Sequence, residues 1–293
     1  MNRFLTTTII GAIALTCGLS QAQITIDASR DTGIFGAGFD GNGVPSFTSR
    51  NLGGHTHAPV GRANSDRVNR GLFDFDIVGS LPAGATVASA VFEFEVTQQG
   101  GIQGTGGDDF DLHVITTAWV EGTGVGNIGE DTFDGASWAS TDGTATWTNL
   151  GGDFNATPLG SVNVVGPDGT NGEAPIVFQI TSPALADYVQ DVVDGAVTNN
   201  GLLLKTATEA VFGSASRVTT IEGGNAAKLI VTVEDDMIMI GDVNMDGAVN
   251  LLDIGPFVDL ISTNTFQAEA DINGDGAVNL LDVGPFVDIL AGG

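Results

Sequence analysis

The sequence predicts a mainly β protein, a β-sandwich with one amphipathic helix, followed by a small α-helical module of two loop–helix repeats. Three observations support this prediction. Short alternating or β-branched runs separated by Gly, Asn and Asp fill the chain up to about residue 234, as in sandwiches and barrels. One segment near residue 190 instead has apolar residues at helical spacing. Residues 241–261 closely resemble residues 270–290, which reveals an internal repeat.

The first residues have the pattern of a secretory signal peptide. Arg3 precedes an apolar stretch over residues 9–19, and small residues precede an expected cut after Ala22. We therefore expect residues 1–22 to be removed, and the mature protein to be secreted, extracellular or associated with the cell surface. No later segment is uniformly apolar over the ~20 residues of a membrane helix, so an integral membrane protein is not expected. The one cysteine, Cys17, lies in the signal region, so the mature chain has no disulfide.

The composition argues against nucleic acid as a partner. The formal net charge is −27, and such a surface repels nucleic-acid phosphates and anionic membranes. The chain contains 43 glycines but keeps plentiful Leu, Ile and Val, which suits a globular all-β protein with many turns better than a disordered one. The acidic surface favours solubility and by itself indicates no partner.

Residues 87–96 (VASAVFEFEV) show the strand alternation best. Alternate residues of this run share one side, which we expect to face a core: Ala88, Ala90, Phe92, Phe94 and Val96. Further strands are expected at residues 71–77, 111–116, 176–180, 202–205, 217–222 and 228–233.

Residues 182–197 are expected to form the one amphipathic helix of this region. Ser182 is suited to cap its N-terminus, and Pro183 follows at the first helical position. The apolar residues recur at helical spacing: Leu185, Tyr188, Val189, Val192 and Val193. The helix should end before residues 199–201 (NNG).

Several ordered motifs resemble the DNRLRE-type domain, a jelly-roll β-sandwich classed among carbohydrate-binding modules. They are residues 71–96 (GLFDFDIVGSLPAGATVASAVFEFEV), 115–126 (ITTAWVEGTGVG), 136–147 (ASWASTDGTATW), 151–154 (GGDF) and 199–206 (NNGLLLKT). The resemblance covers nearly all of residues 25–234. It implies a jelly-roll domain over residues 23–234 that binds polysaccharide or a cell-envelope glycan. The chain departs from the family pattern before the Phe-Asp strand, where Asn69 and Gly71 interleave with Arg67 and Arg70.

Three tryptophans are the candidates for stacking on sugar rings: Trp119, Trp138 and Trp147. The alternative is that they pack in the core, where aromatic side chains are more often found.

Each copy of the repeat contains a calcium loop of the EF-hand type. Ca²⁺ takes about six to eight oxygen ligands. A loop of about 12 residues supplies them from alternate positions and from a carboxylate at its last position, and a glycine near its middle makes the tight turn. The first loop offers Asp242, Asn244, Asp246, the carbonyl of Ala248, Asn250 and Asp253, with Gly247 at the turn. The second offers Asp271, Asn273, Asp275, the carbonyl of Ala277, Asn279 and Asp282, with Gly276 at the turn. We therefore expect two calcium ions.

The duplicated loop and exiting helix resemble a type I dockerin module. Residues 237–240 and 265–270 are too short for the entering helix of a standard EF-hand. We place this module at residues 241–293, after a short linker at 235–240. The resemblance implies docking onto a cohesin-like protein or a cell-surface component.

In dockerins, two residues near the end of each loop largely select the partner, and here they are the pairs Leu251-Leu252 and Leu280-Leu281. Cellulosomal dockerins often have small hydroxyl residues there, so this chain suggests another partner, or none. The alternative is that one leucine of each pair packs inside the module with the apolar residues of the following helix: Ile254, Phe257, Val258 and Ile261, and Val283, Phe286, Val287 and Leu290.

No catalytic constellation stands out in the sequence. Acidic residues are too numerous to single out the carboxylate pair of a glycosidase, and no G-x-S-x-G nucleophile motif is present. We expect a secreted, non-catalytic protein that binds glycan through the sandwich and attaches to a protein through the calcium module. The alternatives are a polysaccharide lyase or glycoside hydrolase built on the sandwich, or a purely structural surface protein. The glycan, the docking partner and the oligomeric state stay open.

Overall fold

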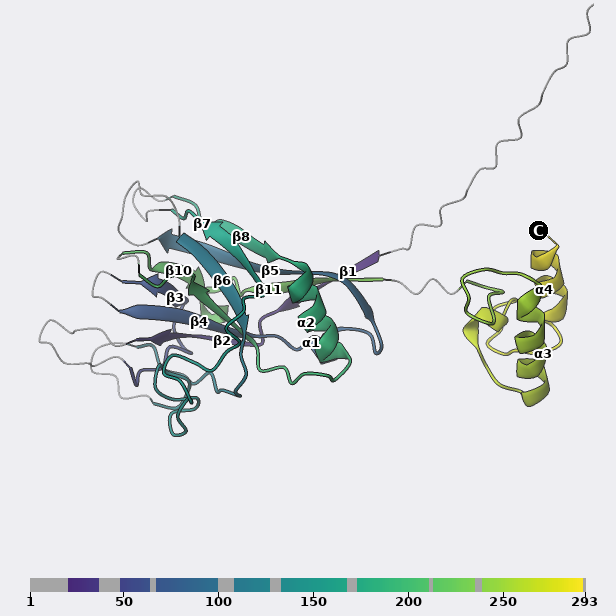
Figure 1. Cartoon of the computed structure of the whole chain (residues 1–293), viewed down its shortest axis with the longest axis horizontal. Coiled ribbons are helices and arrows are strands. Elements are labelled where there is room, and N and C mark those ends of the chain that lie inside the picture. The colour runs from purple at the N-terminus through teal and green to yellow at the C-terminus, as the bar shows by residue number, and fades with distance from the viewer. Residues whose placement is uncertain are drawn as a thin grey trace, which may run out of the picture. The chain divides into compact units, whose positions relative to one another are not determined.

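The computed structural model describes residues 21–36, 48–63, 67–99, 108–126, 133–167, 173–210, 213–234 and 239–291. The chain divides into two compact units, Gln21–Glu234 and a C-terminal unit that begins at Asp235 (Figure 1). Residues 1–20 of the expected signal peptide and residues 235–238 of the expected linker lie outside the described residues, whereas Gln21 and Ala22 belong to the first strand. None of the described helices has the length and apolar character needed to cross a membrane.

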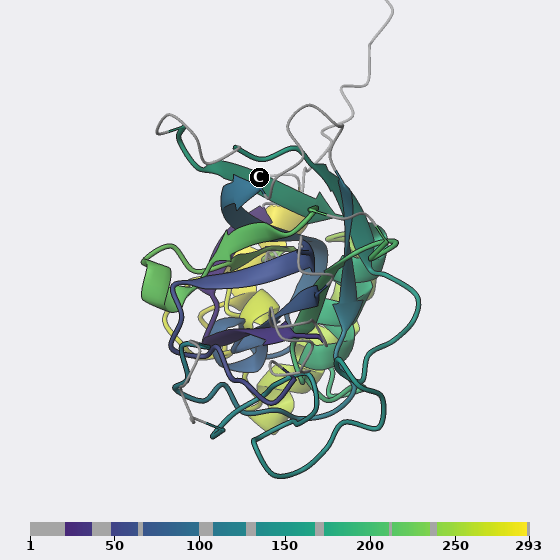
Figure 2. The same ribbon diagram turned by 90° about the vertical axis from the view of Figure 1, so that its left-hand side faces the viewer.

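The first unit is a curled antiparallel sheet (Figures 1 and 2). Its main path runs β1-β11-β5-β10-β3-β4-β9-β6-β7, while β2 pairs with β4 and β8 with β5. The strands are β1 (Gln21–Asp27), β2 (Arg30–Phe35), β3 (His57–Arg62), β4 (Val68–Asp74), β5 (Thr86–Gln99), β6 (Asp108–Val114), β7 (Gly160–Val164), β8 (Ile176–Thr181), β9 (Leu202–Thr206), β10 (Ser216–Thr219) and β11 (Lys228–Glu234). The predicted mainly β fold is confirmed, and the curled sheet fits a jelly roll.

The two halves of the curled sheet enclose a large apolar core. Strand β5 contributes Phe92 and Phe94, and Phe110 on β6 faces them from the other half, with its ring parallel to that of Phe94. Alternate residues of β9 point to opposite sides, so Leu202 and Leu204 enter this core while Leu203 joins a second cluster.

The predicted inward side of β5 is right from Ala90 to Val96 and wrong at Ala88. Ala90 and Val96 are buried in the core. Between Ser89 and Val87 the pairing with β11 shifts by one residue, so Ala88 is the extra residue of a β-bulge. A bulge reverses the alternation beyond it, and Val87 packs against the core instead.

Helix α2 (Pro183–Val193) confirms the predicted amphipathic helix, although it ends at Val193 and not at residue 197. The Ser182 hydroxyl caps it by accepting a hydrogen bond from the Leu185 amide at 3.1 Å. The helix packs against β5, and its buried side consists of the predicted residues Leu185, Tyr188, Val189 and Val192. A short helix, α1 (Ile77–Ser80), follows β4.

The C-terminal unit consists of two loop–helix repeats. The helices are η2 (Leu251–Asp253) and α3 (Ile254–Thr263) in the first repeat, and η3 (Ala268–Ala270) and α4 (Val283–Leu290) in the second. Its core holds Val243, Phe257, Ala270, Val278 and Phe286, with Leu260, Ile261, Ile272 and Leu290 packed against it. The four other residues predicted to pack there are exposed: Ile254, Val258, Val283 and Val287. So small a unit buries one stripe of each helix and leaves the rest in solvent.

Candidate functional site

Backbone amides position the acidic side chains of the first loop. Both oxygens of the fully buried Asp253 carboxylate accept hydrogen bonds, from the amides of Asn244 at 3.0 Å and Asn250 at 2.8 Å. The Asp242 carboxylate accepts from the amides of Asp246 at 3.1 Å and Gly247 at 2.8 Å. The carboxylates at the two ends of the loop are therefore held on the backbone of the residues between them.

The second loop repeats this geometry. Asp282 is again fully buried, and its carboxylate accepts from the amides of Asn273 at 3.1 Å and Asn279 at 2.9 Å. Asp271 accepts from the amides of Asp275 at 3.1 Å and Gly276 at 2.8 Å. Two independent segments with the same hydrogen bonds show that the arrangement follows from the local sequence.

The central glycines take a backbone conformation that other residues avoid. Gly247 has a φ of 84° and Gly276 a φ of 86°, both in the left-handed region. Two residues earlier the repeats differ, because Gly274 is also left-handed at 71° whereas Met245 adopts 57° with a side chain. An L-residue in this region costs about 1–2 kcal/mol, so the first loop is the more strained of the two.

The acidic loops have no base to neutralise them. Residues 235–293 contain no Lys, Arg or His. Each loop nevertheless buries two carboxylates, at Asp242 and Asp253 and at Asp271 and Asp282. Burying a carboxylate without a counter-charge is costly, and a divalent cation among oxygen donors removes that cost. The donor set of each loop, three carboxylates, two amides and one carbonyl, fits Ca²⁺.

The two repeats share one core and are joined by direct non-covalent contacts. The rings of Phe257 and Phe286 pack at a centroid distance of 4.3 Å. The amide of Gly241, just before the first loop, donates to the carbonyl of Glu269, just before the second, at 2.7 Å. The two loops are therefore connected through these contacts between the repeats.

The four leucines near the ends of the loops lie in solvent. Leu251, Leu252, Leu280 and Leu281 are 68–77 % exposed. The alternative in which one leucine of each pair packs inside the module is therefore wrong. Leu251 on η2 and Ile254 and Val258 on α3 follow one another at helical spacing. The second repeat exposes the equivalent residues, and we call these eight side chains the apolar docking surface: Leu251, Leu252, Ile254, Val258, Leu280, Leu281, Val283 and Val287.

Comparison with known families gives a match in the C-terminal module. Residues 240–284 match the family model of the dockerin type I domain. No curated protein was found to match the chain. The match supports the dockerin part of the resemblance and the binding of calcium by this module. The resemblance of the sandwich to the DNRLRE-type domain stays a prediction.

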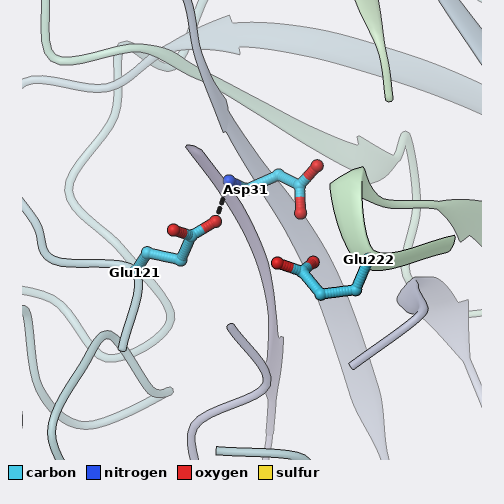
Figure 3. A group of neighbouring side chains, drawn as sticks. All are labelled: Asp31, Glu121 and Glu222. Atoms are coloured by element: carbon cyan, nitrogen blue, oxygen red, sulfur yellow. Dashed lines mark hydrogen bonds between the residues drawn. The ribbon is translucent and has the colours of Figure 1, made fainter. Parts of the chain in front are cut away.

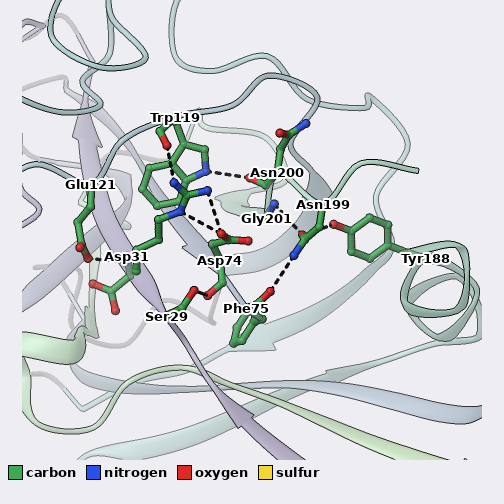
Figure 4. A network of polar contacts seen from close by, with 11 residues as sticks. Ser29, Asp31, Asp74, Phe75, Trp119, Glu121, Tyr188, Asn199, Asn200 and Gly201 are labelled. Carbon is green, nitrogen blue, oxygen red and sulfur yellow. Dashed lines mark hydrogen bonds and ion pairs between the residues drawn. The ribbon is translucent and has the colours of Figure 1, made fainter. Parts of the chain in front are cut away.

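Two of the three candidate tryptophans are core residues. Trp119 and Trp147 are buried in a second apolar cluster, where the segment between β6 and β7 covers the outer side of β2, β4 and β9. The Trp119 indole donates to the carbonyl of Asn200 at 2.8 Å (Figure 4), and that of Trp147 donates to the Ser137 carbonyl at 2.8 Å. For these two residues the core-packing alternative holds, and neither ring presents a face to solvent on which a sugar could stack.

Trp138 is the one candidate that is only partly buried. The Arg70 guanidinium lies over its ring at 4.7 Å from the centroid. The same guanidinium donates to both carboxylate oxygens of Glu209, at 2.6 and 2.9 Å, and to the Gly151 carbonyl at 2.7 Å. Arg70 thereby holds the segment between β6 and β7 on the sheet.

Other residues of the resembling motifs also have structural roles. Asn199 accepts a hydrogen bond from the Tyr188 hydroxyl at 2.9 Å and donates to the Phe75 carbonyl at 2.7 Å, which ties α2 to the end of β4 (Figure 4). Gly201 has a φ of 88°, and a Cβ there would lie 2.5 Å from the Phe73 carbonyl oxygen. The motif residues therefore hold the sandwich together.

The sequence analysis missed one cluster of titratable side chains. Carboxylate oxygens of Asp31, Glu121 and Glu222 lie within 4.8 Å of one another (Figure 3). No sequence signal marks this group, because its members come from β2, from the segment after β6, and from η1 (Ile221–Gly223).

Proposed function

We propose that this protein attaches a secreted β-sandwich to a cohesin-type protein partner through its calcium-loaded C-terminal module. The observation that carries the proposal is the apolar docking surface, which repeats in both halves of a module that matches the dockerin type I model. Exposed apolar patches are unfavourable in water and mark protein-binding sites on soluble proteins. Because the surface is apolar, the partner presents an apolar face with few charges.

Two calcium ions occupy the module in this proposal. The first is held by Asp242, Asn244, Asp246, the carbonyl of Ala248, Asn250 and Asp253. The second is held by Asp271, Asn273, Asp275, the carbonyl of Ala277, Asn279 and Asp282. Each ion supplies the positive charge that its loop lacks. The hydrogen-bonded loop then fixes the start of α3 or α4, and with it the leucine pair at the loop end.

The sandwich, in this proposal, binds a polysaccharide or cell-envelope glycan without cleaving it, outside the cell. The support is the resemblance of residues 25–234 to the DNRLRE-type domain, together with a curled sheet that fits a jelly roll. Of the predicted aromatic ligands only Trp138 keeps part of its surface in solvent. Catalysis by the sandwich and a purely structural role are the competing proposals.

The docking proposal is tested with a panel of type I cohesin domains immobilised on a biosensor. The full chain should bind at least one of them with calcium and none in excess chelator. Replacing Leu251 and Leu280 together by Asp should weaken that binding at least tenfold. Leu150→Asp is the matched control, because this leucine is 65 % exposed on the other unit. If no cohesin binds the calcium-loaded chain, or if the double variant binds as tightly as the wild type, the proposal is wrong.

The glycan proposal is tested by incubating the chain with a panel of polysaccharides. Retention on at least one, with no new reducing or unsaturated ends, is expected. Released ends that disappear after a carboxylate substitution would favour the lyase or hydrolase alternative. No retention on any polysaccharide would favour the structural role.

A further inference from the structure

Three carboxylates from separate parts of the sandwich converge at one place. Asp31 lies on β2, Glu121 lies in the segment between β6 and β7, and Glu222 lies on η1. Each contributes a carboxylate oxygen within 4.8 Å of the other two, and Figure 3 shows the carboxyl of Asp31 facing that of Glu222. Like charges at this distance repel, so another favourable interaction must offset the repulsion among these carboxylates.

Asp31 supplies an independent indication that this place binds a ligand. Its side chain is fully buried, with 0 % of its surface exposed. One carboxylate oxygen, Oδ2, accepts a hydrogen bond from the Ile221 amide at 2.9 Å, whereas Oδ1 is buried and has no hydrogen-bond partner. A buried carboxylate oxygen without a partner is costly, and such groups bind an ion or a proton.

The other two carboxylates are arranged around Asp31. Glu121 is half-buried, and its Oε1 accepts a hydrogen bond from the Asp31 amide at 2.7 Å, which fixes both residues (Figure 3). Glu222 is exposed, so it opens the cluster to water. Burial, with Glu222 and Glu121 adding repulsion, raises the pKa of Asp31 to about 7. A bound cation would offset this burial and repulsion and so favour the ionised form of the three carboxylates.

Burial raises the pKa of the Glu121 carboxyl, and among the described residues the charge of Arg30 favours its ionised form. Arg30 is the adjacent residue, but its guanidinium pairs with Asp74 at 2.9 Å, donates to the Trp119 carbonyl at 2.7 Å, and lies over the Trp119 ring. Successive side chains of a strand point to opposite faces, which takes Arg30 away from the carboxyl of Asp31. In the part of the chain that the structure describes, no Lys or Arg forms an ion pair with any of the three carboxylates.

We propose that Asp31, Glu121 and Glu222 bind a calcium ion in the sandwich, separate from the two loops of the C-terminal module. Oxygen is the only donor in the cluster, which excludes the nitrogen and sulfur ligands that transition metals prefer. The site is irregular and opens to water at Glu222, which suits the flexible coordination of Ca²⁺ better than the strict octahedron of Mg²⁺. Water completes the coordination on the open side.

The ion would link three segments that the backbone does not connect directly. Glu121 belongs to the segment that covers the second apolar cluster, and η1 connects β10 to β11. A calcium ion among them fastens this covering segment to β2. The sandwich then needs calcium to hold this segment in place. Calcium in the medium therefore stabilises both units.

Terbium luminescence tests this site in the full chain. Tb³⁺ replaces Ca²⁺ at oxygen sites, and it emits strongly only when a nearby aromatic ring transfers energy to it. Trp119 is two residues from Glu121, whereas residues 235–293 contain no Trp or Tyr. Emission excited through tryptophan therefore reports the sandwich site. It should saturate with Tb³⁺, and Ca²⁺ should displace it at lower concentration than Mg²⁺.

Matched variants assign the signal to residues. Asp31→Asn and Glu222→Gln should each weaken Tb³⁺ binding at least tenfold. Glu222 is exposed, so its variant tests the site even if Asp31→Asn does not fold. Asp27→Asn, an exposed carboxylate on neighbouring β1, and the double variant Asp253→Asn and Asp282→Asn should keep the signal. Absence of tryptophan-excited emission, unchanged affinity in either Asp31→Asn or Glu222→Gln, or stronger displacement by Mg²⁺ would overturn the proposal.

Discussion

At the scale of single residues, the same residue type has opposite roles within a few positions. Gly247 is left-handed at the turn of the first calcium loop, whereas Gly255 lies in the first turn of α3. A Cβ added at either glycine would meet no atom within 4 Å. Only the backbone conformation distinguishes the two positions, so they form a natural pair for a substitution experiment.

Gly247→Ala should therefore destabilise the calcium-loaded module by about 1–2 kcal/mol, because alanine is strained in the left-handed region. Gly255→Ala should be neutral or stabilise it by up to about 1 kcal/mol, because alanine favours a helix. Thermal unfolding of the fragment of residues 239–293 in calcium measures both. Equal effects of the two substitutions would show that backbone conformation does not control this loop.

His113 is the residue for which the structure predicts a pH dependence of stability. It is buried on β6, its Nδ1 lies 2.8 Å from the Asn155 carbonyl oxygen, and its Nε2 has no hydrogen-bond partner. Burial lowers the pKa of His113 in the folded protein. The unfolded chain therefore binds a proton more readily, so this contribution to stability is complete above about pH 6.5 and is lost as the pH falls towards the lowered folded-state value.

His113→Asn should make the free energy of unfolding less dependent on pH between about pH 7 and about pH 5. Burial also lowers the pKa of His57, whereas Asp31 has a raised pKa and acts in the opposite direction, so the slopes of variant and wild type must be compared. Asparagine keeps a donor for the Asn155 carbonyl. The same slope in His113→Asn and the wild type would contradict the assignment.

At the scale of elements, we expect the two loop–helix repeats to depend on each other and on calcium for their folding. Their helices meet through Phe257 and Phe286, and each is preceded by a loop with two buried carboxylates. A module of this size buries too little apolar surface to offset that charge, so metal binding becomes part of its folding free energy.

Withdrawing calcium should unfold the C-terminal module. With three carboxylates per loop we expect a dissociation constant on the order of 10⁻⁶ to 10⁻⁴ M. At a hundredfold excess of calcium each site then adds about 2.7 kcal/mol. Circular dichroism of the fragment of residues 239–293 should show the helical signal disappear in excess chelator and return with calcium. Helix that persists in chelator, or in the variant Asp242→Ala with Asp271→Ala, would contradict this expectation.

At the scale of the whole molecule, the expected signal-peptide cleavage site overlaps the first strand. The predicted cut after Ala22 falls within β1, where Gln21 pairs with Glu234 and Ala22 with Val233. Cleavage there leaves the pairs from Gln23 to Asp27 along β11 intact. The strand therefore tolerates the loss of its first two residues.

Mass spectrometry of the secreted protein should find an N-terminus at or near Gln23. Removal of the signal segment takes away Ala22, which packs against the main core, and keeps Ile26, the buried core residue of β1. An intact Met1 or a lipid on Cys17 would contradict export by this route.

The sequence by itself determined the features whose physics is local. A calcium loop carries all its ligands within one short segment, a helix shows its cap and its apolar spacing within three turns, and a strand shows its alternation. For that reason the sequence predicts the two loops and the inward face of β5 from Ala90 onwards. It also predicts α2 with Ser182 at its cap.

Only the tertiary structure decided the features that depend on which segments meet. The bulge at Ala88 arises from pairing with β11, and Trp119 and Trp147 are buried because their own segment, between β6 and β7, folds over the outer side of the sheet. The leucine pairs stay exposed because two short helices share one small core. The cluster of Asp31, Glu121 and Glu222 exists only where three segments converge, since charge and burial at such a point are properties of the fold and not of any one stretch of sequence.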